Sequence, residues 1–294
     1  MLDDAVPVLR RFNRAWTQRV GVLDDSFLGS GRALGPNRLL FEIGPEGCGV
    51  RELRDRLGLD SGYVSRMLRQ LEGEGLVLVA PDPADARRRF VTLTARGRDA
   101  HTDLDDRSEV LAQGLLAPLP EKRRAELVEC LDRAEHLVRA ATVVMEGVDP
   151  TSPSARAAVD AYLAELDATF EEGFDAAEAA GDAEALGGPT GQFVLARSDD
   201  VVVGCGGVQR MPDGAAEIKR MWIHPGWRGL GLAGRLLRRL EAEAIALGHD
   251  TVRLDTNRAL TTAIAMYGAA GYLPIGRYND NPYADHWFEK RLGD

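Results

Sequence analysis

The sequence lacks the features of a membrane-spanning or secreted protein. No apolar run approaches the ~18 residues that a membrane-spanning helix needs. The N-terminus, MLDDAVPVLRRF, carries acids where a signal peptide carries basic residues. The three cysteines, Cys48, Cys130 and Cys205, lie far apart and form neither a disulfide framework nor a zinc motif. We therefore expect a cytoplasmic protein with no metal site and with buried, reduced cysteines.

The sequence also lacks an excess of basic charge. Its formal net charge is −10, of which residues 1–141 contribute −1 and residues 142–294 contribute −9. Seven arginines nevertheless fall within 33 residues of the first half: Arg66, Arg69, Arg87, Arg88, Arg89, Arg96 and Arg98. A local basic surface of this kind can bind phosphates although the total charge is near zero.

The first half has the pattern of several helices around one β-hairpin. LVLVA (76–80) and RRFVTLT (88–94) predict two strands joined by a long turn. Helical spacing of apolar residues and Gly or Pro stops predict helices over residues 5–30, 36–43, 50–57, 61–73 or 75, 95–117 and 120–141. This order predicts a mainly α winged helix-turn-helix domain over residues 1–141.

The helix that starts at residue 61 has the character of a DNA-recognition helix. Val64, Leu68 and Leu71 form its buried face. Polar and basic residues that can contact bases or phosphates occupy its outer face and the hairpin tip: Ser61, Ser65, Arg66, Arg69, Arg87 and Arg88. A solvated helix face, with Arg66 and Arg69 pairing to neighbours such as Glu72, is the alternative.

Two stretches resemble the MarR family of winged-helix regulators. They are LGLDSGYVSRMLRQLEGEGLV and DPADARRRFVTLTARG, the second with the spacing Asp85-x-Arg87 and Leu93-Thr94-x-x-Gly97. The resemblance implies a homodimer, built from the first and the last two helices, that binds double-stranded DNA at a pseudo-palindromic site. It also implies a small-molecule effector. Asp85 is expected to hold the wing arginines, since a carboxylate repels phosphate.

The second half, residues 142–294, reads as an α+β domain with a mixed sheet. PTSPS (150–154) resembles a linker, but TVVMEGV (142–148) before it reads as a strand, which places the domain boundary at 141/142. Further strands are expected at 192–197, 201–211, 216–223, 251–257, 272–277 and 286–291, with helices at 154–174, 229–247 and 260–270 and a loop at 176–191.

The strongest motif of this half joins a strand to a long helix. After the strand ending at Ile223, the run Arg228-Gly229-Leu230-Gly231-Leu232-Ala233 opens the helix. Glycines there leave backbone N–H groups uncovered at a positive helix end, which suits a pyrophosphate. No Lys-Ser/Thr follows, which excludes a P-loop. A Rossmann loop is disfavoured because the motif follows a hairpin meander.

This run resembles the acyl-CoA pyrophosphate loop of the GNAT acetyltransferases, Arg/Gln-x-x-Gly-x-Gly/Ala. LDTN (254–257) and MYGAAGYLPIGRY (266–278) resemble that superfamily's next strand and helix. The resemblance implies acetyl-CoA as cofactor, bound in a splayed mixed sheet between the strands ending at Ile223 and Asn257. The backbone groups of Met221 and Ile223 would pair with pantetheine.

The same resemblance implies direct acyl transfer to an amine. Tyr267 is the candidate acid for the CoA sulfur and Glu217 the candidate base through water; the alternatives are a core aromatic and an exposed strand carboxylate. Asn257 would bind the cofactor or substrate amide, or cap a turn. His224 is expected to order its loop.

Polar side chains near the C-terminus are candidates for the acceptor pocket: Asn279, Asn281, Tyr283 and His286. The alternative for His286 is that it pins the last strand. The net −9 of this half favours a cationic amine over an anionic acceptor.

Together these patterns predict a transcriptional regulator fused to an acetyl-CoA-dependent N-acetyltransferase for a small-molecule amine. Two alternatives stay open. The second domain could be a non-catalytic acetyl-CoA or ligand sensor, or the first domain could be only a dimerisation scaffold.

Overall fold

The chain folds into two compact units, Met1–Val128 and Glu129–Asp294. The computed structural model describes residues 2–170, 184–199 and 201–293. The division between the units falls inside helix α6 (Glu121–Thr142), so the domain boundary at 141/142 stays a prediction. No helix of the described residues is both long and apolar enough to span a membrane.

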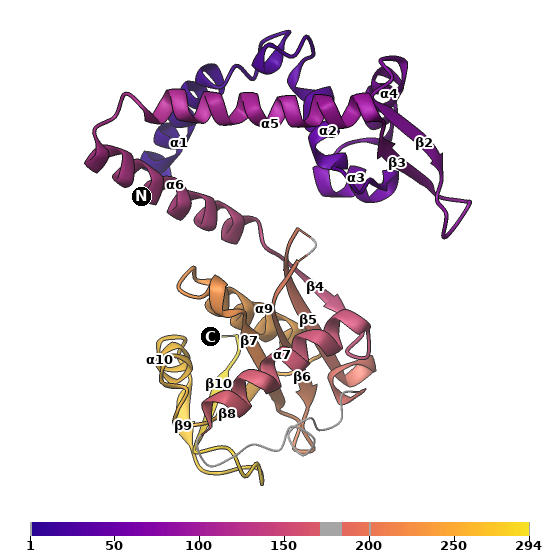
Figure 1. Ribbon diagram of the computed structural model, residues 1–294. Helices are drawn as coiled ribbons and strands as arrows, with labels where there is room; N and C mark the ends of the chain where they lie inside the picture. The colour runs from indigo at the N-terminus through magenta and orange to yellow at the C-terminus, as the bar shows by residue number, and fades with distance from the viewer. Residues whose placement is uncertain (1, 171–183, 200, 294) are drawn as a thin grey trace. The chain divides into compact units, whose positions relative to one another are not determined.

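The N-terminal unit packs helices against a small antiparallel sheet of strand order β1-β3-β2, whose β2–β3 hairpin extends beyond them (Figure 1). Its elements in chain order are α1 (Leu2–Arg19), η1 (Phe27–Gly29), α2 (Leu34–Ile43), β1 (Cys48–Gly49), α3 (Val50–Leu57), α4 (Ser61–Gly73), β2 (Val77–Pro81), β3 (Arg89–Leu93), α5 (Ala95–Leu116) and the start of α6. The winged helix-turn-helix expected from the sequence is present.

Side-chain caps fix where the two helices on either side of the hairpin begin. Asp60 accepts a hydrogen bond from the Tyr63 backbone N–H at 2.9 Å and starts α4. Thr94 accepts from the Gly97 N–H at 3.0 Å and starts α5. A Cβ at Gly97 would lie 1.9 Å from the Leu76 carbonyl oxygen, so only glycine lets α5 approach β2 this closely. The hairpin and the recognition helix are thereby held in one packed unit.

Two expectations for the N-terminal half are wrong in detail. The helix expected over residues 5–30 ends at Arg19, because the chain turns at Gly21, whose φ of +67° is outside the helical range. Leu23, expected on the apolar stripe, is 90% exposed. Cys130, expected to be buried, is exposed on α6, whereas Cys48 and Cys205 are buried.

The C-terminal unit is a seven-stranded mixed sheet between helices. Its elements after α6 are β4 (Val144–Val148), α7 (Pro153–Thr169), η2 (Glu184–Leu186), η3 (Gly188–Thr190), β5 (Gly191–Ser198), β6 (Val201–Arg210), β7 (Ala216–Ile223), η4 (Pro225–Trp227), α9 (Leu232–Ala246), β8 (Thr251–Thr256), α10 (Thr261–Ala269), β9 (Leu273–Ile275) and β10 (His286–Arg291). The helix expected to reach residue 174 ends at Thr169. Residues 171–183, which include the first half of the expected loop at 176–191, lie outside the described part.

Strand order is β4-β5-β6-β7-β8-β10-β9, and β7 and β8 are the parallel neighbours among antiparallel ones. These two strands pair only at Ala216↔Val252 and Glu217↔Arg253. Beyond Ile218, therefore, β7 has no partner on the β8 side within the described residues. The expected splay of the sheet is present at this point.

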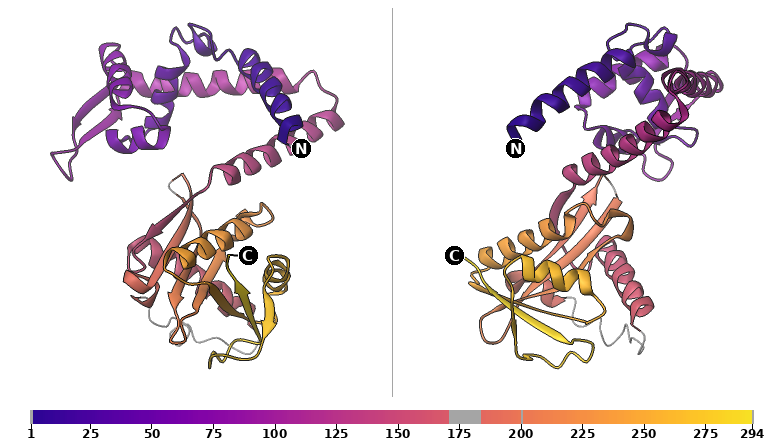
Figure 2. Two further views of the ribbon diagram at one scale, coloured as in Figure 1. Left: turned by 180° about the vertical axis from the view of Figure 1, so that it is seen from behind. Right: turned by 90° about the vertical axis from the view of Figure 1, so that its left-hand side faces the viewer.

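Helices cover the two faces of this sheet (Figure 2). On one face, α9 buries Leu236, Leu237 and Leu240 against β6 and β7, in a cluster that includes Tyr267 of α10. On the other, α7 packs Ala158 and related apolar residues against β5 and β6. The splay between β7 and β8 thus opens between helices rather than at a bare edge.

Arginines of α9 also hold the chain where it enters the sheet. Arg235 donates hydrogen bonds to the carbonyls of Ala140 and Val143, and Arg239 donates to the Met145 carbonyl at 3.0 Å. Arg139 at the end of α6 lies 4.8 Å from the centre of the Trp227 ring. The last turn of α6 is therefore part of the C-terminal unit's packing.

Candidate functional sites

The segment between β7 and α9 forms a glycine-rich loop with uncovered backbone groups. His224 accepts a hydrogen bond from the Gly226 N–H at 3.2 Å and orders the short η4 turn. Gly229 and Gly231 both adopt φ of +76°, and a Cβ built on either would meet no atom within 4 Å. Gly231 caps α9 without any side chain, so the first N–H groups of the helix are open to an anion.

Arg228 is a structural tie at the start of this loop. Its Nε donates to the Ile223 carbonyl at 3.0 Å, and its terminal nitrogen lies 2.6 Å from Glu165 of α7. Glu165 also accepts from the indole N–H of the buried Trp222 at 2.8 Å. One carboxylate on α7 thus fixes both the end of β7 and the loop, a link of 63 residues in sequence that the local motif did not indicate.

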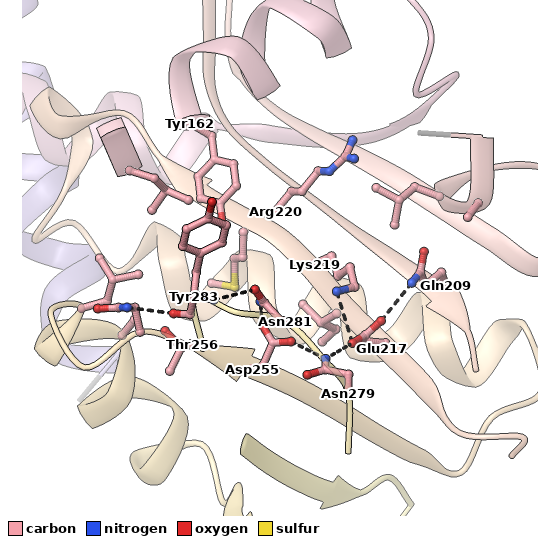
Figure 3. A pocket seen from close by; sticks show the side chains of 18 of the residues that line it. Tyr162, Gln209, Glu217, Lys219, Arg220, Asp255, Thr256, Asn279, Asn281 and Tyr283 are labelled. Atoms are coloured by element: carbon pink, nitrogen blue, oxygen red, sulfur yellow. Dashed lines mark hydrogen bonds and ion pairs between the residues drawn. The ribbon is translucent and has the colours of Figure 1, made fainter. Parts of the chain in front are cut away.

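Two cavities meet at the splay. One, of about 410 Å³, is lined by the loop and the starts of α9 and α10, including Met221, Ile223 and Ala233. The other, of about 550 Å³, lies on the α7 face of the sheet (Figure 3). Tyr162 and Tyr267 line both. A molecule in one cavity would therefore meet a molecule in the other beside these two tyrosines.

Tyr267 keeps its proton in this setting. Its side chain is buried, and its ring packs against Tyr272 and Phe288. Burial raises the pKa of Tyr267, and the negative charge of Asp255 raises it further. The phenol is consequently neutral at physiological pH and available as a proton donor.

Glu217 lies in the 550 Å³ cavity but its oxygens are engaged. It is 5% exposed, and Gln209 Nε2 donates to one oxygen at 2.9 Å. The Tyr278 hydroxyl donates to the other at 3.0 Å, and Lys219 Nζ is 3.3 Å from it. Burial, followed by the charge of Glu217, raises the pKa of Tyr278, so this hydroxyl stays a donor to the carboxylate.

The sequence did not single out Asp255, which the structure places in the same cavity. Asn279 Nδ2 donates to Asp255 at 2.5 Å and to Glu217 at 3.2 Å, and Asn281 Nδ2 donates to Asp255 at 3.0 Å (Figure 3). The alternation of buried Val252, Leu254 and Thr256 along β8 was a signal that could have placed Asp255 on the cavity face.

The other expected pocket residues divide into two groups. Asn279, Asn281 and Tyr283 line the 550 Å³ cavity. His286 is exposed on β10, paired with Thr256 in the ladder, and is not among the lining residues described. Asn257 lines the cavity as well, but it donates to the Tyr283 carbonyl at 2.7 Å and accepts from the Ala259 N–H at 2.9 Å, so it shapes the turn after β8.

The expected DNA-contacting side chains are on the surface of the N-terminal unit. On α4, Ser61, Ser65, Arg66 and Arg69 are exposed, with the buried face opposite. At the wing, Arg87 and Arg88 are exposed too.

Asp85 organises the wing tip, as expected. Its carboxylate accepts from the Arg87 N–H at 3.0 Å and lies 3.4 Å from Arg88 Nε.

No group of three or more His, Cys, Asp or Glu within residues 2–170, 184–199 and 201–293 is arranged to hold a metal ion.

Comparisons with known proteins divide along the same two halves. Residues 158–272 match the acetyltransferase (GNAT) family, and residues 38–88 match the MarR family. A protein named IAA acetyltransferase from Azospirillum brasilense is 37% identical over 105 residues, covering 34% of this chain and 69% of that protein.

For the N-terminal half, the HTH-type transcriptional regulator YdgJ of Bacillus subtilis, itself uncharacterized, is 32% identical over 82 residues, covering 28% of this chain and 50% of that protein. Among solved structures, a GNAT-family acetyltransferase from Staphylococcus aureus Mu50 superimposes with a TM-score of 0.45 at 17% identity, covering 51% of this chain and 100% of that one.

Proposed function

Because the chain belongs to the GNAT family of acetyltransferases and joins that domain to a MarR-family winged helix, we propose that it is both a DNA-binding regulator and an active N-acetyltransferase for a small amine. The observation that carries the enzymatic part is the meeting of two cavities beside Tyr267, one of them bordered by an open anion-binding loop.

The residues of the smaller cavity fit acetyl-CoA. The N–H groups from Arg228 to Ala233 would hold its pyrophosphate at the start of α9, where the helix dipole favours negative charge. The free edge of β7 at Met221 and Ile223 would hydrogen-bond the pantetheine arm. Asn257, which borders the neighbouring 550 Å³ cavity, would bind the cofactor or substrate amide. Bound acetyl-CoA would supply an acetyl thioester.

The chain's own groups would then manage two protons. A bond forms between the amine nitrogen and the acetyl carbon as the carbon–sulfur bond breaks. Tyr267 would give its phenolic proton to the departing sulfur. Glu217 would take the amine proton through water, with Asn279, Asn281 and Tyr283 lining the acceptor cavity around it.

Thiol release from acetyl-CoA over a panel of amines tests the enzyme. Replacing Tyr267 by Phe removes the proton donor, and we expect kcat to fall by about 10²-fold with little change in KM. Tyr272→Phe is the matched control, because Tyr272 packs in the same cluster but lines neither cavity. CoA binding without thiol release from any amine would favour the sensor alternative.

The exposed face of α4 and the wing support DNA binding. Gel-shift with DNA from upstream of the protein's own coding region tests it, since regulators of this class commonly act there. We expect Arg66→Ala to weaken the complex, whereas Arg38→Ala, a charge loss on α2, should leave it intact. Equal binding by both variants, or none by the parent chain, would support the scaffold alternative.

A homodimer is supported by apolar side chains that α1 leaves exposed. Leu9, Phe12 and Trp16 are 64%, 51% and 41% exposed, which is unusual for a surface with no partner. Such a dimer would present two recognition helices to a pseudo-palindromic site. Sedimentation with Phe12→Glu against the parent chain measures this, and a monomeric parent would exclude it. A small-molecule effector of DNA binding stays a prediction.

A further inference from the structure

Asp255 lines the acceptor cavity at the level where β7 and β8 part. It lies two residues beyond Arg253, the last residue of β8 that pairs with β7. Besides burial, its charge raises the pKa of both Tyr162 and Tyr267. These two tyrosines line both cavities, and Asp255 lines the larger one together with them.

The carboxylate of Asp255 is held by neutral groups. Its two oxygens accept from the amides of Asn279 and Asn281, and no Lys, Arg or His of the described residues forms an ion pair with it. The neighbouring charged side chains, in contrast, have partners of opposite charge. Glu217 pairs with Lys219, and Arg253 pairs with two acidic side chains. Asp255 therefore contributes a negative charge that no cation in the described part of the chain cancels by direct contact.

The basic side chains that line the cavity, Arg210, Lys219 and Arg220, do not cancel this negative charge. Lys219 is engaged by Glu217 at 3.3 Å. Arg210 is exposed at the rim, and Arg220 has an interaction of its own. A half-buried carboxylate that two amides hold in place can bind a cation strongly, because it is already oriented and partly desolvated. An anionic acceptor beside it would be repelled.

We propose that Asp255 binds the ammonium group of the acceptor, and that the acceptor is an aliphatic amine carrying a positive charge at physiological pH rather than a neutral arylamine or an anion. This inference rests on the proposed acetyltransferase function. It gives Asp255 a role in binding and selection. The bound ammonium would lose one proton to water before its nitrogen attacks, and the nitrogen would lose a second, through water, to Glu217 as the amide forms.

Two isomeric amines make a direct test. Benzylamine and p-toluidine have the same atoms, but at pH 7.5 the first is an ammonium ion and the second is neutral. Each is titrated calorimetrically into the full chain saturated with CoA, and each is assayed for thiol release with acetyl-CoA. The first variant is Asp255→Asn, which is nearly isosteric with the parent residue. The second is Asp280→Asn, which removes a charge from a fully exposed side chain of the loop that contains Asn279 and Asn281.

The parent chain should bind benzylamine at least about tenfold more tightly than p-toluidine, a typical effect of one charge-assisted hydrogen bond. Asp255→Asn should remove this preference, because it should raise the Kd and the KM of benzylamine and leave those of p-toluidine unchanged. Asp280→Asn should keep the preference. The proposal is overturned if the parent chain shows no preference, if Asp255→Asn keeps the ratio, if both isomers weaken together, or if Asp280→Asn has the same effect.

A loss of kcat with unchanged benzylamine affinity would also overturn it, because Asp255 would then be the base instead. Selective binding that depends on Asp255, with no thiol release from either amine, would leave this inference standing while the proposed enzymatic function fails.

Discussion

Replacing Glu165 should separate the effects of the two contacts that its carboxylate makes, one with Trp222 and one with Arg228. Glu165→Gln keeps an oxygen for the Trp222 indole N–H but removes the charge that holds Arg228. Glu165→Ala removes both. Trp222 is only 7% exposed, so losing its acceptor should cost about 1–3 kcal/mol of stability. The Arg228 side chain is 48% exposed, so its ion pair contributes no more than about 1 kcal/mol after solvent screening.

These magnitudes predict different outcomes for the two variants. In Glu165→Gln the freed loop should raise the Kd for CoA by up to about fivefold, with thermal stability little changed. In Glu165→Ala the same loss of affinity should accompany a destabilisation of about 2 kcal/mol. Asp167→Asn, an exposed carboxylate on the same helix, is the control.

Calorimetric CoA titration and denaturant unfolding followed by tryptophan fluorescence measure both quantities. Equal destabilisation by Gln and Ala, or CoA affinity unchanged in both, would refute the assignment of Glu165 as the link between β7 and the loop.

Three further changes test other parts of the chain. Gly97→Ala would place a Cβ 1.9 Å from the Leu76 carbonyl oxygen; it should destabilise the N-terminal unit by about 3 kcal/mol in denaturant unfolding, and parent-like stability would show that α5 does not approach β2 so closely. Arg66→Ala should weaken DNA binding about 5- to 100-fold and, if the contact is to phosphate, reduce the salt slope by about one; fluorescence anisotropy over a salt series measures both, and unchanged values would place this side chain away from DNA. Burial raises the pKa of Cys205 to about 12, so this thiol stays protonated at pH 7; mass spectrometry after alkylation of the native chain should find the exposed Cys130 labelled first, and faster labelling of Cys205 would contradict its burial.

Local patterns were sufficient to predict much of this protein. The hairpin of β2 and β3 and the glycine run before α9 each depend on neighbouring residues, so they could be recognised in the sequence. The helix expected through residue 30 was overestimated because apolar spacing continued past Gly21, whose positive φ ends the helix.

The remaining features depend on contacts between distant segments. Asp255 joins the site only because the loop at 279–281 folds back and holds it with two amides. Glu165 and Arg228 come together only when α7 packs on the sheet. Glu217 was identified from the family resemblance. The hydrogen bonds that occupy both of its oxygens come from β6 and from the loop that holds Tyr278 and Asn279, so they could not be inferred from sequence.

The arginine contacts of α9 decide where an isolated acetyltransferase half should begin. The carbonyls of Ala140, Val143 and Met145 are recognised by Arg235 and Arg239, and Arg139 covers Trp227 next to the glycine loop. A fragment cut at 142 would leave Arg235 with one of its two carbonyl acceptors and uncover the indole. A fragment that starts near residue 129 retains all of these partners, so the last turns of α6 should be kept with the GNAT domain even when the winged-helix domain is removed.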